Sequence, residues 1–186
     1  TPERGKGFCI FNNVAIAARY AQQTHKFRKV LIVDWDVHHG DGTQEIFYSD
    51  DTAFYFSTHQ WPWYPGTGLP AETGCGKGEG FTLNCLFPRG SSGEEIVAAY
   101  RQKLVPAADA FRPELVLISA GFDSQAGDPM GMFSLTDGDF AEMTSVALGI
   151  AEKHAEGRLV SVLEGGYNLN LLGPAVAAHV RALTKS

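Results

Sequence analysis

The sequence predicts an α/β protein of three layers, in which a mostly parallel sheet is covered by helices on both faces. Apolar runs typical of strands alternate with amphipathic stretches typical of helices, which is the pattern of such a fold. The 186 residues are 44% hydrophobic and 19% charged, which suits one soluble globular domain with a substantial core. The chain shows no repeats or linkers, so we expect residues 1–186 to form a single domain.

Each element follows from a local pattern. The run Val30-Leu31-Ile32-Val33 is typical of a buried strand, and Ser92 with Glu95 three positions later forms a capping box that begins a helix. We expect helices at about 12–24, 42–48, 92–110, 137–154 and 169–184, and strands at 30–34, 53–57, 81–86, 115–119 and 158–163.

Composition narrows the classes of partner and compartment. The formal net charge of −6 and pI near 5.4 argue against a broad basic face for nucleic acid, but suit a cationic substrate resembling lysine or a polyamine. The sequence contains neither an apolar run of membrane-spanning length nor a signal or lipidation motif at its start. Cys9, Cys75 and Cys85 lack a CxxC spacing, so we expect reduced thiols and a cytoplasmic protein. From the charge and the lack of a membrane-spanning run, we expect no direct nucleic-acid or membrane partner.

The segment 33–42 places metal-ligand residue types at the end of a strand. In an extended chain Asp34, Asp36 and His38 project to one side, whereas residues 35, 37 and 39 project to the other. Two carboxylates and an imidazole packed together are costly without a compensating cation, which favours a metal site. The alternative is an ordinary loop in which Asp34 caps a helix and both histidines are solvated.

Two further strand ends carry polar groups. Asp123 and Asp128 follow the strand 115–119, and the segment 164–168 follows the strand 158–163. Ligands of open α/β sheets collect at the carboxyl ends of strands, so we expect the three ends to converge. The segment 59–80 contains Trp61, Trp63 and Tyr64, which either wall a binding slot or plug a sheet edge.

The ordered set of motifs resembles the zinc-dependent histone deacetylase superfamily along essentially the whole chain, and the ending Glu164-Gly165-Gly166-Tyr167-Asn168 resembles its class II and bacterial branch. The resemblance implies a fold like that of arginase and the deacetylases. It is carried by the segments 7–13, 34–43, 64–68, 119–123, 127–129 and 164–168.

The resemblance also implies a site for hydrolysing an acetamide. Asp36, His38 and Asp128 would bind zinc, with iron(II) as an alternative, and leave coordination positions open for a carbonyl and a water. Tyr167 would donate a hydrogen bond to the developing oxyanion. The walls of the acyl-lysine tunnel would be formed by Phe8 and Tyr64, with the carbonyl of Gly7 and with Leu135 at the rim.

A second, structural cation is implied as well. Asp34, Ser57 and Thr58, together with the backbone of Asp36 and His38, match a site for potassium or sodium in the family.

The family's catalytic histidine pair belongs to a Pro-Gly-His-His-Ala segment that would precede Thr1. Asp34 and Asp41 match the carboxylates that orient this pair, and His39 does not replace it, because strand parity turns it away from the metal. We therefore expect this chain to be the C-terminal portion of a deacetylase domain, without the first strands and helices of the fold. Such a portion would have one uncovered sheet edge, a tendency to self-associate and little or no turnover of its own.

The implied reaction is removal of an acetyl group from acetylated lysine in a peptide, or from a related acetylated amine, by metal-activated water. The alternatives are an acetylpolyamine amidohydrolase, an acetoin-utilisation deacetylase and a non-catalytic module that binds metal or acyl-lysine. An arginase-like site with two manganese ions is disfavoured, because Gly40 stands where a further carboxylate ligand is needed.

Overall fold

The computed structural model of the protein describes residues 3–184 and confirms the predicted fold class. Five strands form one sheet in the order β3-β2-β1-β4-β5, and every neighbouring pair is parallel. The bounds are Val30–Asp34 for β1, Ala53–Gln60 for β2, Thr82–Phe87 for β3, Leu115–Ala120 for β4 and Leu159–Leu163 for β5. Strand β1 is central and β4 lies next to it, so the polar residues that follow these two strands lie near the middle of the carboxyl edge of the sheet.

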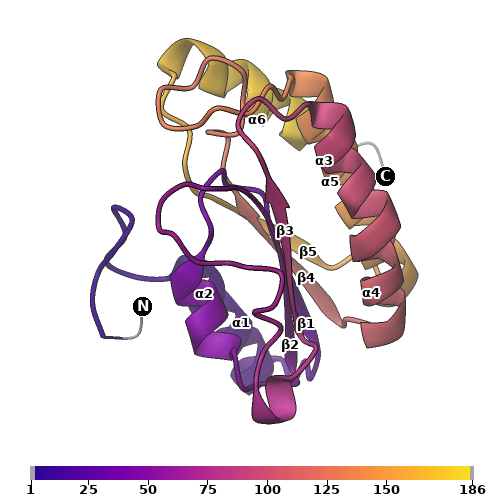
Figure 1. Cartoon of the computed structure of the whole chain (residues 1–186). Helices are drawn as coiled ribbons and strands as arrows, with labels where there is room; N and C mark the ends of the chain where they lie inside the picture. The colour runs from indigo at the N-terminus through magenta and orange to yellow at the C-terminus, as the bar shows by residue number, and fades with distance from the viewer. Residues whose placement is uncertain (1–2, 185–186) are drawn as a thin grey trace.

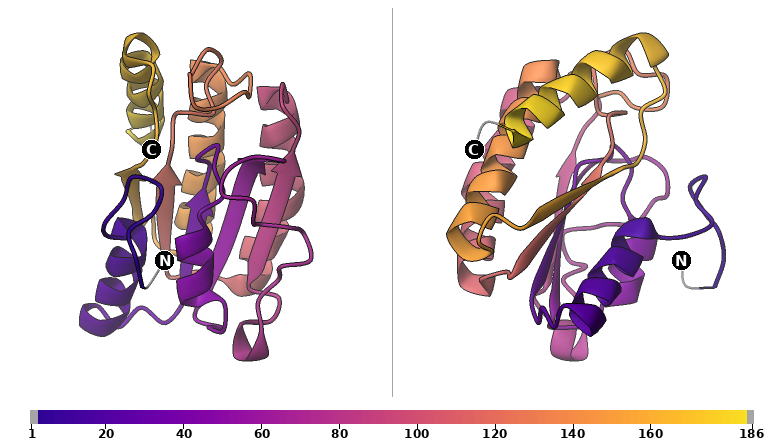
Figure 2. Two further views of the ribbon diagram at one scale, coloured as in Figure 1. Left: turned by 60° about the vertical axis from the view of Figure 1, so that its left-hand side comes forward. Right: turned by 180° about the vertical axis from the view of Figure 1, so that it is seen from behind.

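Helices cover both faces of this sheet (Figure 1). One face carries α1 and α2, the other carries α3, α4 and α5, and α6 packs against α5 (Figure 2). The bounds are Asn13–Thr24 for α1, Asp41–Phe47 for α2, Gly93–Ala99 for α3, Val105–Phe111 for α4, Asp137–His154 for α5 and Leu169–Leu183 for α6. A short 3-10 helix, η1, spans Gly76–Gly78.

Apolar side chains form two cores, one on each side of the sheet. All residues of β1, β2 and β4 are buried, as a parallel sheet with helices on both faces requires. Trp35 and Val37 point into the larger core, whereas Asp36 and His38 do not, so the alternation expected after β1 is present. The packed strands therefore give the residues beyond their ends a rigid support.

Two elements differ from the expected ones. The helix expected at 92–110 is divided into α3, a π-helical turn at Tyr100–Leu104 (η2) and α4. Pro106 has no N–H to donate to the preceding turn, which accounts for the wider turn before it. Strand β2 continues through Gln60, so His59 lies in a strand rather than in a loop.

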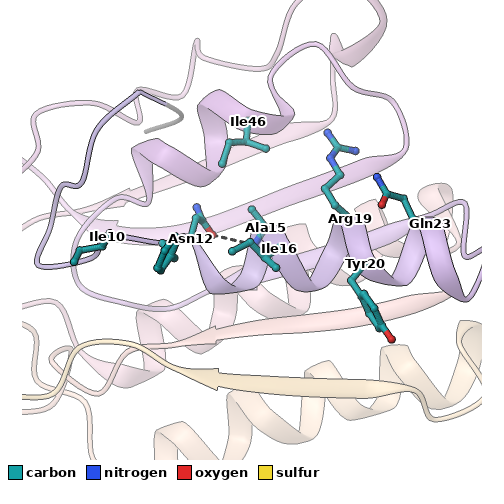
Figure 3. Close-up of a pocket in the computed structure, with 9 residues that line it drawn as sticks. Ile10, Asn12, Ala15, Ile16, Arg19, Tyr20, Gln23 and Ile46 are labelled. Atoms are coloured by element: carbon teal, nitrogen blue, oxygen red, sulfur yellow. Dashed lines mark hydrogen bonds between the residues drawn. The ribbon is translucent and has the colours of Figure 1, made fainter.

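The edge strand β5 and the outer side of α1 expose apolar side chains. Val160 and Leu163 on β5 are 48% and 57% exposed. Along α1, an open groove is lined by Ile10, Ile16 and Tyr20 together with Ile46 of α2 (Figure 3). Within residues 3–184, no helix is both long and apolar enough to cross a membrane.

Candidate metal centre

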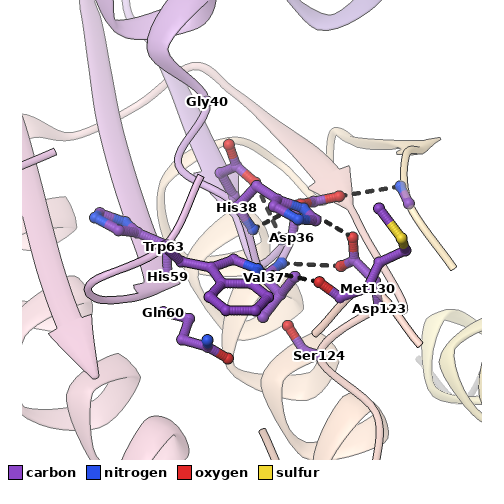
Figure 4. Close-up of polar contacts among 12 residues, drawn as sticks. Asp36, Val37, His38, Gly40, His59, Gln60, Trp63, Asp123, Ser124 and Met130 are labelled. Atoms are coloured by element: carbon purple, nitrogen blue, oxygen red, sulfur yellow. Dashed lines mark hydrogen bonds and ion pairs between the residues drawn. The ribbon is translucent and has the colours of Figure 1, made fainter. Parts of the chain in front are cut away.

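Asp36, His38 and Asp123 meet at the carboxyl edge of the sheet (Figure 4). Each offers one ligand atom, and these atoms all lie within 4.8 Å of one another. Nδ1 of His38 is 2.9 Å from Oδ1 of Asp36 and 3.2 Å from Oδ2 of Asp123. The group contains two oxygen donors and one nitrogen donor, which is the ligand chemistry of a zinc or iron(II) site.

Backbone amides beyond the ends of β1 and β5 fix the two carboxylates. The N–H of Val37 donates to Oδ1 of Asp123 at 2.9 Å, and the N–H of Gly165 donates to Oδ2 of Asp36 at 3.0 Å. The N–H of His38 donates to Oδ1 of Asp36 at 2.8 Å. The segments after β1, β4 and β5 therefore converge as predicted.

The space around these donors fits a bound ion. Oδ2 of Asp123 is buried, faces Nδ1 of His38 at 3.2 Å and has no further hydrogen-bond partner within residues 3–184, so a cation that replaces the imidazole proton would satisfy this oxygen. A Cβ at Gly165 would lie 2.2 Å from this oxygen, and a Cβ at Gly121 would lie 2.4 Å from Oδ2 of Asp36. Glycine at both positions thus leaves room that any side chain would fill.

The charges of the group also suit a divalent cation. Burial lowers the pKa of His38, but hydrogen bonds to Asp123 and Asp36 outweigh burial and raise it to about 10. Burial raises the pKa of Asp123, and the nearby charge of Asp36 raises it further. Without metal, the imidazole therefore holds a proton between two carboxylates, and a divalent ion would replace that proton and balance both negative charges.

The structure groups Asp123, and not the expected Asp128, with Asp36 and His38. Oδ2 of Asp128 accepts the N–H groups of Tyr167 and Asn168 at 2.7 and 3.1 Å, and its Oδ1 accepts the N–H of Met130 at 2.8 Å. Within the described residues, Asp128 is not part of the ligand group. Its carboxylate instead fixes the backbone that carries Tyr167. The signal for Asp123 was its place just beyond the end of β4.

The aromatic residues expected at the site form two ring contacts, one of them with His38. Tyr167 is 38% exposed, and its ring lies 6.1 Å from that of Phe8, while the ring of Tyr64 lies 6.0 Å from that of His38. Burial raises the pKa of Tyr167 to about 12, and the charges of Asp123 and Asp36 contribute, so its hydroxyl remains a donor at neutral pH. Gly7 and Phe8 both have a left-handed backbone, with φ of 57° and 63°.

The expected place of Leu135 at the tunnel rim is wrong. Leu135 is 1% exposed and belongs to the larger core, because the loop after β4 folds back and its N–H donates to the carbonyl of Ser124. The same loop is joined to the aromatic segment, since Nε1 of Trp63 donates to the carbonyl of Met130 at 3.1 Å.

Asp34 and Ser57 are paired in register across β1 and β2, beside Thr58. The carboxylate of Asp34 accepts from the hydroxyl of Tyr55 at 2.8 Å and from the N–H of Asp36 at 3.1 Å, and burial raises its pKa well above the ordinary range. Oγ1 of Thr58 lies 3.5 Å from the hydroxyl of Tyr100. The monovalent-cation site at these residues stays a prediction.

Asp41 occupies a separate position, at the start of α2. It forms an ion pair with Lys6, whose Nζ lies 5.6 Å from the centroid of the Tyr64 ring. Lys6 therefore connects the N-terminal segment to the second carboxylate that the resemblance placed beside the histidine pair.

Sequence reasoning missed a buried polar cluster beneath the segment 61–80, which we call the His39–His59 network. The rings of His39 and His59 lie 4.7 Å apart. His39 contacts Thr67 and Gln44 at 2.8 and 3.0 Å, and Nε2 of His59 lies 3.1 Å from the carbonyl oxygen of Gly68. Further members are Glu72, which accepts from Gln44, and Asn84, which donates to Gln44. The network holds in place the segment that carries Tyr64, and no local motif marks its members.

Comparisons with known proteins agree with this architecture. A model of the histone deacetylase domain matches residues 1–183. The chain is 48% identical to a probable deacetylase of Archaeoglobus fulgidus over 90% of this chain and 46% of that protein. It is also 45% identical to the human polyamine deacetylase HDAC10 over 95% of this chain and 27% of that protein.

Among solved structures, the crystal structure of the HDA15 HD domain superposes with a TM-score of 0.89 at 39% identity, over 98% of this chain and 53% of that one. The chain thus spans about half, or less, of the proteins it matches. This chain belongs to the histone deacetylase domain family.

Proposed function

We propose that this chain supplies the metal centre of a deacetylase that hydrolyses acetylated amines. The observation that carries the proposal is the group Asp36, His38 and Asp123, in which a buried oxygen of Asp123 faces the His38 ring and has no further hydrogen-bond partner among the described residues. Relatives named deacetylase, including a polyamine deacetylase, support the reaction class. Acetylated lysine in a peptide and an acetylated polyamine are the two substrate classes to compare.

Each residue of the site has a role in this proposal. Asp36, His38 and Asp123 would hold a zinc ion, with iron(II) as the alternative, which polarises an amide carbonyl and lowers the pKa of a bound water. The hydroxyl of Tyr167 donates to the oxygen of the amide as negative charge develops on it. Asp128 fixes the backbone of Tyr167 through its N–H.

The aromatic rings beside the ligand group would bind the substrate's methylene stem and exclude water. Phe8 packs edge-on against Tyr167, and Tyr64 packs edge-on against His38. Phe8 is 83% exposed, so its ring is free to contact a ligand that enters above the metal. An apolar wall on both sides of the stem strengthens the polar interactions at the amide.

Zinc titration of the chain, followed by binding of a small hydroxamate, tests the metal centre. We expect one zinc per chain, and we expect hydroxamate binding that requires zinc and is lost in Asp36→Asn. Absence of zinc binding, or a stoichiometry near two, contradicts the proposed centre.

Turnover of an acetyl-lysine peptide and of an N-acetylated polyamine, measured side by side, tests the reaction. Hydrolysis of either, lost in Asp123→Asn, supports the deacetylase. Hydroxamate binding without turnover of either substrate instead favours the non-catalytic alternative for the chain by itself.

A further inference from the structure

His179 lies buried on α6, behind the strand ends that carry the metal ligands. Its ring meets Trp35 edge-on, with centroids 5.4 Å apart, and meets Phe122 at 5.9 Å. Trp35 directly precedes Asp36 in the chain, and Phe122 directly precedes Asp123. One side chain therefore touches the neighbours of two proposed ligands, which follow different strands.

Hydrogen bonds fix the orientation of this ring. The hydroxyl of Thr144 donates to the carbonyl of Phe140 at 2.6 Å, so toward Nδ1 of His179, also at 2.6 Å, its oxygen can only accept. Nδ1 therefore carries the proton, and Nε2 accepts from the hydroxyl of Ser161 at 2.9 Å. Burial lowers the pKa of His179, in keeping with a neutral ring. Contacts on α5 and β5 thus prevent the ring from turning.

Trp35 depends on such packing for its own position. Its Nε1 is buried and has no hydrogen-bond partner within residues 3–184, so no hydrogen bond of the indole fixes the ring. The flanking rings are His179 at 5.4 Å and Tyr100 at 6.5 Å. A change at His179 would therefore be transmitted to the backbone on either side of Trp35, including that of Asp36.

We propose that His179 is a positioning residue for the metal ligands. It holds Trp35 and Phe122 so that Asp36 and Asp123 lie at one ion, and it ties both to α6, the helix that begins just after Tyr167. The inference rests on the metal centre proposed above. It adds a residue that touches neither the ion nor the substrate.

Zinc affinity of two variants, measured by competition with a chromophoric chelator, tests this role. His179→Leu removes the ring and both hydrogen bonds, and we expect zinc to bind about tenfold more weakly, the lower end of what supporting partners of metal ligands contribute. His179→Phe keeps a ring against Trp35 and Phe122, and we expect it to recover part of that loss. If His179→Leu does not fold, His179→Phe alone decides, and we expect zinc binding weaker than in the unaltered chain.

Phe111→Leu is the matched control, because Phe111 is a buried aromatic residue at the opposite end of the sheet. It packs against Phe54, near the start of β2, and against Phe81, which directly precedes β3. It should lower stability without changing zinc affinity. With Co²⁺ bound at saturation, the visible absorption bands should shift in His179→Leu and stay unchanged in Phe111→Leu.

Equal zinc affinity in His179→Leu and the unaltered chain overturns the positioning role and leaves the metal centre standing. An equal loss in Phe111→Leu also overturns it, since the effect would then be one of general stability. Failure of the unaltered chain to bind zinc overturns both proposals.

Discussion

His38 and His39 are adjacent in the chain and have opposite environments. His38 lies between two carboxylates, which raise its pKa to about 10 in spite of burial. His39 lies in the His39–His59 network, where burial lowers its pKa and outweighs the hydrogen bond to Gln44 and the charge of Glu72, which raise it. Alternation of side chains beyond a strand end sends two identical residues to two sites, and the partners then decide which one holds a proton. In the proposed metal centre a cation would replace that proton, whereas the His39–His59 network holds the segment 61–80 in place.

The largest expected effect is a difference in zinc affinity between variants of Asp123 and Asp128, the two carboxylates that follow β4. Asp123→Asn should weaken zinc binding by more than about 100-fold, because it removes a ligand rather than a supporting partner. Asp128→Asn should weaken it by less than about tenfold, since that carboxylate accepts backbone N–H groups. Isothermal titration of both variants measures the difference. A larger loss in Asp128→Asn would restore Asp128 as the ligand.

The pH dependence of zinc binding tests the proton on His38. Zinc must displace that proton, so between pH 6 and 8 the affinity should rise by roughly tenfold per pH unit. Titrations in buffers of different ionisation enthalpy should show about one proton released per zinc bound. An affinity that does not change over this range would mean that His38 is already neutral in the metal-free chain.

The pKa of His59, in the His39–His59 network, is shifted in the opposite direction to that of His38. Burial, together with the nearby His39, lowers the pKa of His59 to about 3, while the unfolded chain binds this proton near the ordinary value of about 6.5. The contribution of His59 to stability is therefore full above about pH 6.5 and is lost as the pH falls toward about 3.

Urea unfolding of the metal-free protein at pH 7 and 4.5 measures this loss. His59→Asn should reduce the difference between the two pH values. His25→Asn, which changes an exposed histidine just beyond α1, is the control and should leave it unchanged. An unaltered difference in His59→Asn would assign the acid sensitivity to other groups.

The smallest expected effect concerns Glu72, which joins the network to the segment that carries Tyr64. Its carboxylate accepts from Nε2 of Gln44 at 2.6 Å and from the N–H groups of Gly68 and Leu69 at 3.0 Å. Glu72→Gln keeps the shape and removes the charge, so we expect a loss of about 1 kcal/mol in the free energy of unfolding, with zinc affinity unchanged.

Glu79→Gln, at an exposed carboxylate that accepts from Thr73, should have a smaller effect and serves as the control. Loss of zinc binding in Glu72→Gln would show that the His39–His59 network and the proposed metal centre are coupled.

Most of the fold could be predicted from the sequence because periodicity and caps are local. The helix expected at 137–154 matches α5, and the capping box of Ser92 and Glu95 begins α3 as expected. The π-helical turn before Pro106 was not predicted, because hydrophobic periodicity reports which residues are apolar and not which carbonyl an N–H reaches. Strand β2 extends past its expected end because its later residues are polar but buried.

The candidate site was harder to predict where the backbone path of a loop determines which side chains face the site. Asp36 and His38 follow a strand whose alternation extends beyond its end, so their convergence was predictable. Asp123 and Asp128 lie in one irregular loop, and only its backbone path determines which carboxylate turns toward the others. Leu135 is buried for the same reason, because the loop folds back to the core.

Gly121 and Gly165 keep the space between the carboxylates open because glycine has no side chain. One added methyl at Gly165 would fall on the carboxylate of Asp123 while every donor atom kept its identity. Gly165→Ala is therefore a control that keeps every proposed ligand and blocks the space between them. The zinc signal of this variant measures adventitious surface binding and can be subtracted from that of the unaltered chain.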